Sequence, residues 1–382
     1  MIEVLLVIIF ILLIIIYLIS YSKKSSNNNN IYSAEYYRGL NYLLNNQDDK
    51  ALKIFTDLID IDSSTIETHL ALGGVYRRRG EFDKAILIHQ NLLSRPQLDK
   101  SIKNQSLYEL AKDFFSAGLY DKSEKILINL KDNKNYEESC NEYILLIYEL
   151  SKDWDTAINF TKNIRQDEIR NLPINIILSQ YFCEKASDYQ TDNQLNKSIT
   201  ILKKAIDVCP ECVRAFSMLF KLNISSNPDL ALNYLIKLVE IDSSFLIILS
   251  DDILEMSVLY QDKKIDSRIM NIILEYSKSE EFSPDLYEFM FNLNESKSPE
   301  EYVEKTNQNS FTAIYDKLYV NKDDETEVYF ELLSMIKNNY TTYNCSNCGY
   351  SPKKYIWLCP SCNHWQTIML NTISDKVSTN AR

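Results

Sequence analysis

Glycine and proline are scarce in this 382-residue chain, which contains six glycines and eight prolines. So few turn-forming residues argue against an all-β or loop-rich fold and make helix the expected secondary structure. Histidine is scarcer still, with three residues, and no Ser-His-Asp grouping, P-loop, G-x-G-x-x-G or H-E-x-x-H motif occurs. The sequence therefore argues against an enzyme.

An excess of basic residues is also absent. The net charge of −12 at pH 7 argues against a nucleic-acid-binding surface. The run Arg77-Arg78-Arg79 fits a contact with anionic lipid or an acidic partner, or a solvated turn end. We favour the solvated turn.

One long uncharged stretch opens the chain. Val4 to Ile19 is an unbroken apolar run, and no charged residue occurs between Glu3 and Lys23. This length suits a helix that spans a bilayer. A signal peptide would begin with positive charge and end in a small-x-small cleavage site, and neither is present. We predict one transmembrane helix over 1–22.

Lys23 and Lys24 follow this run directly. Because positive charge is retained on the cytoplasmic side, the bulk of the chain is expected in the cytoplasm. That compartment is reducing, which favours metal binding over disulfides for cysteines. The polar residues 23–31 are then a short tether to the membrane.

From residue 32 onward, small and aromatic residues recur with a period of 34. The clearest pairs at this offset are Gly39 with Gly73, Tyr42 with Tyr76, Ala51 with Ala85, Phe55 with His89 and Leu58 with Leu92. This is the tetratricopeptide period, in which a small residue on the first helix lets the second approach. We predict an all-α superhelix of six repeats over 32–243, capped by a degenerate helical segment over 244–340.

The first helix of each repeat lines the concave face of such an array, which suits a peptide or protein partner. Residues on this face either bind that partner or pack between neighbouring repeats. The expected groove residues are Tyr36, Leu40, Leu43, Glu67, Leu70, Arg77, Tyr108, Lys112 and Phe115.

Two C-x-x-C pairs separated by ten residues lie near the end of the chain. The four cysteines are Cys345, Cys348, Cys359 and Cys362. This spacing favours a closed tetrahedral site for one iron or zinc ion over two disulfides or four incidental thiols. Gly349 and Asn363 follow the pairs, where such turns need a residue that tolerates positive φ. Four thiolates leave no open position, so the metal is expected to be structural.

The metal replaces a hydrophobic core in this unit, which we predict to be a rubredoxin-like ribbon over 341–370, followed by a tail over 371–382. The span Tyr350 to Leu358 is long enough only for a hairpin.

A third C-x-x-C, Cys209-Pro210-Glu211-Cys212, resembles a redox pair. It is expected in the turn between the fifth and sixth repeats, without a surrounding βαβ pattern, and we favour coincidence. Cys140 and Cys183 have the pattern of small buried helix residues.

The order of these parts resembles the lipopolysaccharide assembly protein B family of Gram-negative bacteria. Five segments carry the resemblance: Tyr37 to Ala51, Thr68 to Gly73 and Ile88 to Gln90 in the first repeats, and Tyr343 to Tyr350 and Trp357 to Cys362 in the ribbon. The four metal ligands match the family's ribbon without a gap.

The resemblance implies regulation rather than catalysis. It implies a single-pass protein of the bacterial inner membrane that directs the lipid A deacetylase LpxC to the membrane AAA protease FtsH and so limits lipopolysaccharide synthesis. It also implies an opposing inner-membrane regulator that senses lipopolysaccharide, and allows lipopolysaccharide itself as a ligand. A homodimer is left open.

Two other functions fit the same parts. The first is a scaffold that gathers envelope biosynthesis enzymes without directing proteolysis. The second is electron transfer, with the ribbon as a working rubredoxin, which bound zinc would exclude.

Overall fold

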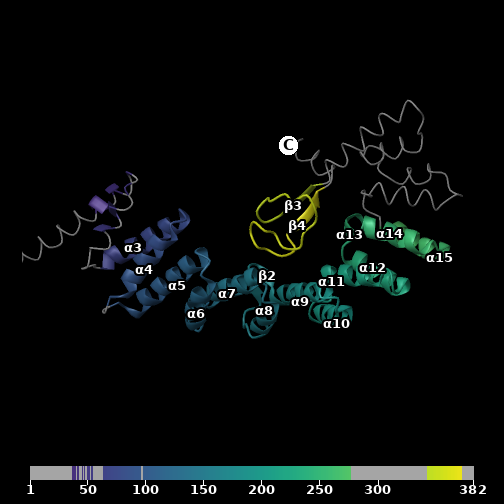
Figure 1. Cartoon of the computed structure of the whole chain (residues 1–382), viewed down its shortest axis with the longest axis horizontal. Coiled ribbons are helices and arrows are strands. Elements are labelled where there is room, and N and C mark those ends of the chain that lie inside the picture. The colour runs from purple at the N-terminus through teal and green to yellow at the C-terminus, as the bar shows by residue number, and fades with distance from the viewer. Residues whose placement is uncertain are drawn as a thin grey trace, which may run out of the picture. The chain divides into compact units, whose positions relative to one another are not determined.

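A computed structural model describes residues 37–39, 41–42, 45, 47, 50–51, 53–54, 63–95, 98–276 and 342–371 (Figure 1). The expected membrane helix and tether, and the helices expected beyond residue 276, lie outside these ranges. In the described ranges, no helix combines the length and the apolar character needed to cross a membrane.

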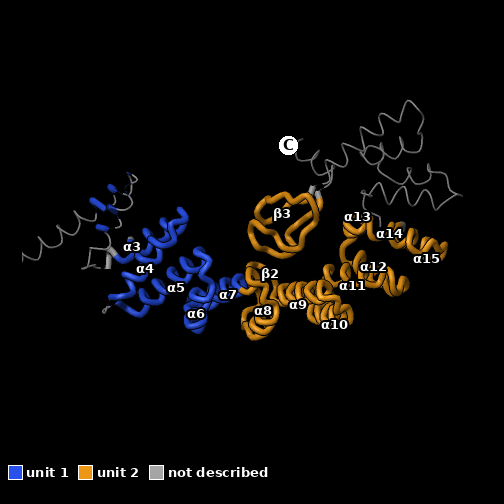
Figure 2. Tube along the Cα trace, viewed as in Figure 1, with its two compact units in different colours: residues 1–147 blue, residues 148–382 orange. Residues whose placement is uncertain are grey.

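The chain divides into two compact units, residues 1–147 and 148–382 (Figure 2). Unit 1 is built from pairs of antiparallel helices, as tetratricopeptide repeats require. Its helices are α3 (Ser63–Arg78), α4 (Phe82–Leu93), α5 (Lys100–Ser116), α6 (Tyr120–Leu130) and the first part of α7 (Glu137–Ser151). Helix α3 packs on α4, and α5 packs on both α4 and α6.

A glycine sets the close approach of α3 and α4. A Cβ added to Gly73 would lie 2.4 Å from the ring of His89. Ala85 and His89 on α4 are both fully buried. The small residue expected from the 34-residue period therefore does what the repeat requires, because the second helix fills the space that a side chain at residue 73 would occupy.

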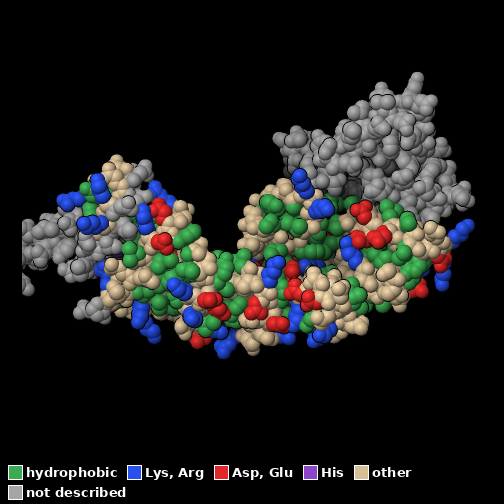
Figure 3. Space-filling model, in the orientation of Figure 1, with side chains coloured by type: hydrophobic (Ala, Val, Ile, Leu, Met, Phe, Trp, Pro, Cys, Tyr) green, Lys and Arg blue, Asp and Glu red, His purple; other side chains and the backbone are tan. Residues whose placement is uncertain are grey.

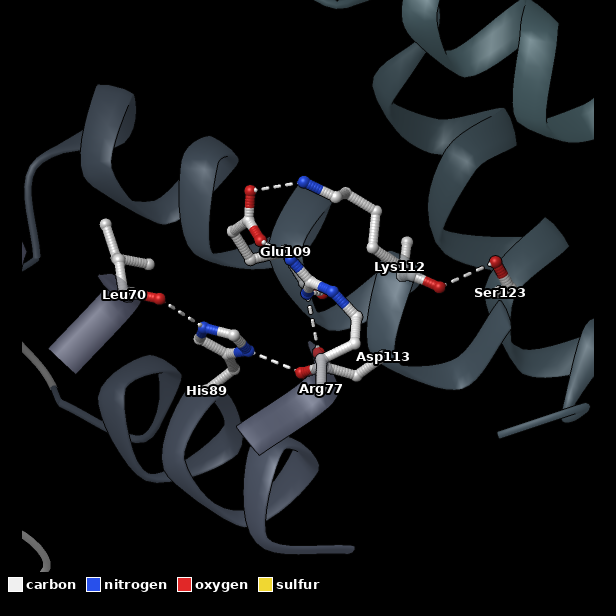
Figure 4. Close-up of polar contacts among 8 residues, drawn as sticks. Leu70, Arg77, His89, Glu109, Lys112, Asp113 and Ser123 are labelled. Atoms are coloured by element: carbon white, nitrogen blue, oxygen red, sulfur yellow. Dashed lines mark hydrogen bonds and ion pairs between the residues drawn. The ribbon is translucent and has the colours of Figure 1, made fainter. Parts of the chain in front are cut away.

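A polar network crosses the core of unit 1 (Figure 4). The fully buried carboxylate of Asp113 pairs with His89 Nδ1 and, at 2.7 Å, with Arg77 Nη1. Arg77 Nη2 lies 2.6 Å from Glu109 Oε2, and Lys112 Nζ lies 2.9 Å from Glu109 Oε1. The network joins the first helices of two successive repeats to α4 and satisfies the buried charges.

Unit 2 continues the helix pairs. Its helices are the last part of α7, α8 (Trp154–Lys162), α9 (Ile174–Thr191), α10 (Leu195–Val208), α11 (Val213–Asn223), α12 (Pro228–Ile241), α13 (Phe245–Ile248), α14 (Ser250–Tyr260) and α15 (Lys263–Tyr276). Helix α9 packs on α8 and α10, α11 packs on α12, and α15 packs on α12 and α14.

A small hairpin interrupts the helices of unit 2, which the all-α prediction does not include. Strand β1 (Glu168–Ile169) pairs antiparallel with β2 (Leu172–Pro173). Arg170 and Asn171 form the turn, with φ of 53° and 59°. Two consecutive left-handed residues are the conformation of a type I′ turn, whose twist suits two-residue hairpins.

The C-terminal ribbon is held by β3 (Thr342–Cys345) and β4 (Ile368–Asn371), which pair antiparallel with Cys345 opposite Ile368. The expectation of a hairpin within Tyr350 to Leu358 is wrong. The strands pair the two ends of the ribbon instead, and Leu358 makes one bridge with Trp365. Strand β4 ends one residue beyond the expected bound of the ribbon.

Candidate metal centre

The two C-x-x-C turns have the same backbone hydrogen bonds. Gly349 N–H donates to Cys345 O and Asn363 N–H donates to Cys359 O, both at 2.9 Å. Gly349 has φ of 75° and Asn363 has φ of 54°, so the predicted positive φ after each pair is confirmed. Each turn thus presents its two sulfurs toward the other turn.

The four cysteine sulfurs lie close together and surround one position. Cys345 Sγ lies 3.7 Å from Cys362 Sγ, Cys348 Sγ lies 3.6 Å from Cys359 Sγ, and all four atoms lie within 4.8 Å of one another. With metal–sulfur bonds of about 2.3 Å, the edge of a regular tetrahedron is about 3.8 Å. The donor set and its geometry fit one zinc or iron ion bound by four cysteines.

The surroundings shift the pKa values of Cys345 and Cys359 in opposite directions. Desolvation acts to raise the pKa of Cys345, but hydrogen bonds from Thr367 and from the N–H groups of Cys348 and Asn347 outweigh it and lower that pKa to about 6. Desolvation raises the pKa of Cys359 to about 12. Thr367 Oγ1 lies 3.2 Å from Cys345 Sγ, where it can donate to a metal-bound thiolate.

The ribbon is seated on the repeats of unit 2 through a buried carboxylate. Glu149, on α7, is 7% exposed. Its carboxylate accepts hydrogen bonds from Trp365 Nε1 at 3.1 Å and from Tyr181 Oη at 2.6 Å. Arg170 binds both oxygens, at 2.5 and 3.0 Å, and also donates to Asn363 O at 2.7 Å. Because each neighbour is a donor, the buried charge is fully compensated.

Aromatic and cation–π contacts also hold the ribbon, and we call Glu149, Arg170, Tyr181, Arg214 and Phe245 together the seat of the ribbon. The Arg214 guanidinium on α11 lies 5.6 Å from the ring centre of Trp365 and 5.7 Å from that of Trp357. Phe245 on α13 stacks on Trp357 with ring centres 5.5 Å apart and planes 12° apart. Residues of α7, α9, α11, α13 and the β1–β2 hairpin therefore hold the ribbon. Figure 3 shows hydrophobic side chains, coloured green, on the visible face of the ribbon.

Sequence reasoning did not find the residues of this seat. Glu149, Arg170, Tyr181 and Arg214 occupy ordinary repeat or connecting positions. Each lies more than 150 residues along the chain from its partner in the ribbon, which is Asn363 for Arg170 and Trp365 for the other three. The structure, rather than the sequence, marks one of them: Arg170 lies in a turn at positive φ, where arginine is uncommon, and its side chain bridges Glu149 and the ribbon.

The expected groove residues are not all open to a partner. Tyr36, Leu40 and Leu43 lie outside the described residues. Glu67 is exposed, whereas Leu70 is buried. Arg77 and Lys112 are half-buried and both pair with Glu109.

Two aromatic groove residues, Tyr108 and Phe115, are half-buried, and each packs on Tyr143 at ring-centre distances of 6.2 and 5.1 Å. Burial raises the pKa of Tyr108 to about 12. Partner binding by the groove residues stays a prediction.

Comparison with known proteins agrees with both parts of the chain. Residues 343–369 match the family model described as rubredoxin metal binding domain, and residues 68–101 match that of the tetratricopeptide repeat. The chain is 27% identical to lipopolysaccharide assembly protein B of Haemophilus influenzae over 358 residues, which cover 88% of this chain and 89% of that protein. It is 26% identical to the protein of the same name from Escherichia coli K12, with the same coverage.

These matches bear out the resemblance seen in the repeats and the ribbon, and they indicate an interaction protein rather than an enzyme. Over 88% of its length, the chain is a homologue of lipopolysaccharide assembly protein B.

Proposed function

We propose that the chain is an adaptor of the bacterial inner membrane that limits lipopolysaccharide synthesis. In this role it promotes degradation of the lipid A deacetylase LpxC by the membrane protease FtsH. The homology to lipopolysaccharide assembly protein B along nearly the whole chain carries the proposal.

The structure is compatible with this role in two respects. Tetratricopeptide arrays bind proteins along an extended surface. The four-cysteine site is closed, which suits a structural metal that shapes the ribbon and its seat rather than a metal that performs chemistry.

The proposed location rests on the sequence. The apolar run Val4 to Ile19, followed by Lys23 and Lys24, favours a single membrane pass with the bulk of the chain on the cytoplasmic side. A short tether would raise the effective concentration of the array near other membrane-anchored proteins, FtsH among them.

The test is the half-life of LpxC in cells that carry the intact gene, a deletion, or Cys345→Ser with Cys348→Ser. We expect the deletion and the double substitution to lengthen the half-life several-fold. Cys140→Ser is the matched control, since Cys140 is a buried thiol of unit 1 outside the ribbon, and it should leave the half-life unchanged.

An unchanged half-life on deletion would overturn the adaptor proposal. A set of copurified proteins that contains envelope biosynthesis enzymes and no protease would then favour the scaffold function.

A further inference from the structure

Two cysteines that are not metal ligands meet inside unit 2. Cys183 lies on α9 and Cys212 is the N-cap residue of α11, and both are fully buried. Their sulfurs lie 3.9 Å apart. Cys212 also belongs to the C-x-x-C motif with Cys209. The fold therefore places beside Cys212 a further cysteine, Cys183 of the preceding repeat, which the motif does not reveal.

The surroundings of Cys212 favour a thiolate. The Cys183 thiol donates a hydrogen bond to its sulfur, which is the largest influence and lowers the pKa of Cys212. Desolvation opposes this, while Ser179, the Ala215 N–H and the charge of Arg214 assist it, with the result that the pKa falls to about 6. Gln180 Nε2 lies 3.9 Å from the same sulfur.

The pKa of Cys183 is shifted in the opposite direction from that of Cys212. Desolvation raises its pKa well above the ordinary value. A thiolate at a helix N-terminus in contact with a neutral thiol is the arrangement of a nucleophilic cysteine and its resolving partner.

We propose that Cys183 and Cys212 are a redox-modification site, which a small hydroperoxide converts into a disulfide between α9 and α11. Both residues are fully buried, so the reaction requires a local opening that lets hydrogen peroxide reach the Cys212 sulfur.

The reaction is balanced in two steps. The Cys212 thiolate attacks one oxygen of hydrogen peroxide, which forms the S–O bond of a sulfenic acid, breaks the O–O bond and releases hydroxide. The Cys183 sulfur then attacks the Cys212 sulfur, its proton leaves with the sulfenic oxygen as water, and the disulfide forms. Over both steps, one thiolate and one thiol are oxidised to the disulfide, and one hydrogen peroxide is reduced to water and hydroxide.

The site lies beside the seat of the ribbon. Two residues before Cys183, Tyr181 packs on Trp365, and two residues after Cys212, Arg214 lies over the same ring. A disulfide would therefore tie together the two helices that hold Trp365 and fix the spacing of the seat.

The test treats the purified full chain, reduced and loaded with its metal, with hydrogen peroxide. Free thiols are then alkylated, and the chain is digested with trypsin without reduction. Cys183 lies in the tryptic peptide 171–185, and Cys209 and Cys212 lie together in 205–214. We expect mass spectrometry to find these peptides joined and lighter than their sum by two hydrogen atoms.

Fragmentation of the joined peptide should place the bond between Cys183 and Cys212. The joined peptide should persist in Cys209→Ser and disappear in Cys183→Ser. Cys140 is the internal control, because it is equally buried but has a pKa raised to about 12 by desolvation, and its thiol should stay free.

A bond to Cys209, a Cys212 sulfenic acid that never joins Cys183, or two peptides that stay unjoined while the ribbon oxidises would each overturn the proposal. A second measurement is the unfolding midpoint after oxidation. It should lie higher in the wild-type chain than in Cys183→Ser, whose ribbon suffers the same oxidation. Equal midpoints in the two oxidised chains would contradict a bond between α9 and α11.

Discussion

Helix α3 packs closely on α4 because residue 73 is a glycine, which has a hydrogen where other residues have a Cβ. An alanine Cβ there would lie 2.4 Å from His89 Cε1 and Nε2. His89 is fully buried and paired with Asp113, so its ring has no room to move aside. We expect Gly73→Ala to lower the free energy of unfolding of unit 1 by about 1–3 kcal/mol, as overpacking does. Urea denaturation followed by circular dichroism measures it.

The neighbouring glycine is the matched control. A Cβ at Gly74 would lie 3.6 Å from its nearest neighbour, Arg78 Nη1, which is an ordinary contact. Since alanine is favoured over glycine in a helix by about 1 kcal/mol, Gly74→Ala should stabilise unit 1. The same sign of effect for both variants would show that His89 is not the obstacle.

The ion pairs of Glu109 predict a pH dependence. Desolvation acts to raise the pKa of Glu109, but the hydrogen bonds and charges of Lys112 and Arg77 outweigh it and hold this pKa below 4.5. The unfolded chain therefore binds the proton first on acidification. The stability that Glu109 contributes is present above pH 4.5 and is lost as the pH falls through the lower folded-state pKa.

Glu109→Gln tests this dependence. At pH 7 the variant should be less stable than the wild type, and the difference should shrink as the pH falls below 4.5. Chemical denaturation across pH 3 to 7 measures it. Glu67→Gln, which removes an exposed carboxylate from α3, should show a much smaller difference. A constant deficit for Glu109→Gln over the whole range would refute the role of its charge.

Two buried tryptophans pack on the same tyrosine, and only one of them donates a hydrogen bond to Glu149. Comparing the two therefore distinguishes the energy of that hydrogen bond from the energy of ring packing. Trp365 and Trp154 both contact Tyr181. Trp365 Nε1 donates to Glu149, whereas the buried Trp154 Nε1 finds no acceptor among the described residues. Both substitutions to phenylalanine remove similar volume, but only Trp365→Phe takes a donor from a buried carboxylate.

We expect Trp365→Phe to cost more than Trp154→Phe by about 1.5–3 kcal/mol, because hydrogen bonds to charged groups have this strength. Thermal and urea denaturation of unit 2 compare the variants. Equal losses would mean that Arg170 and Tyr181 satisfy Glu149 without the ribbon.

The elements that could be predicted from the sequence are those set by local rules. The 34-residue period places Gly73 against His89, and the spacing of the cysteines with Gly349 and Asn363 fixes both turns of the ribbon. The β1–β2 hairpin could not be predicted, because its strands have two residues each and its turn is Arg-Asn rather than Asn-Gly. The strand pairing of the ribbon joins its ends, which no local pattern encodes.

The seat of the ribbon could not be predicted either, because its contacts join residues that are far apart in the chain. Glu149 and Trp365 are 216 residues apart in the chain. A glutamate in a helix ordinarily indicates an exposed position, and only the tertiary fold brings Tyr181, Arg170 and Trp365 to this one. The metal ligands could therefore be named from the sequence, while the residues that position the ribbon could not.

Across unit 2, the metal should control residues far from its ligands in sequence. The ribbon's buried cluster is small, formed by Cys345, Cys359 and Ile368, so the ribbon depends on the metal to fold. We expect a metal chelator to release Trp365 from its seat. Two of the three tryptophans in the chain, Trp357 and Trp365, belong to the ribbon, so the fluorescence maximum should shift to longer wavelength.

Hydrogen exchange locates the effect. Chelation should speed amide exchange in the β1–β2 hairpin and at the start of α11, where Arg170 and Arg214 hold the ribbon, and leave α5 and α6 of unit 1 unchanged. The Cys345→Ser, Cys348→Ser variant should show the fast exchange without chelator and no further change with it. If the metal leaves while exchange at the seat stays slow, the ribbon docks without its metal, and the buried contacts of Glu149 alone hold it there.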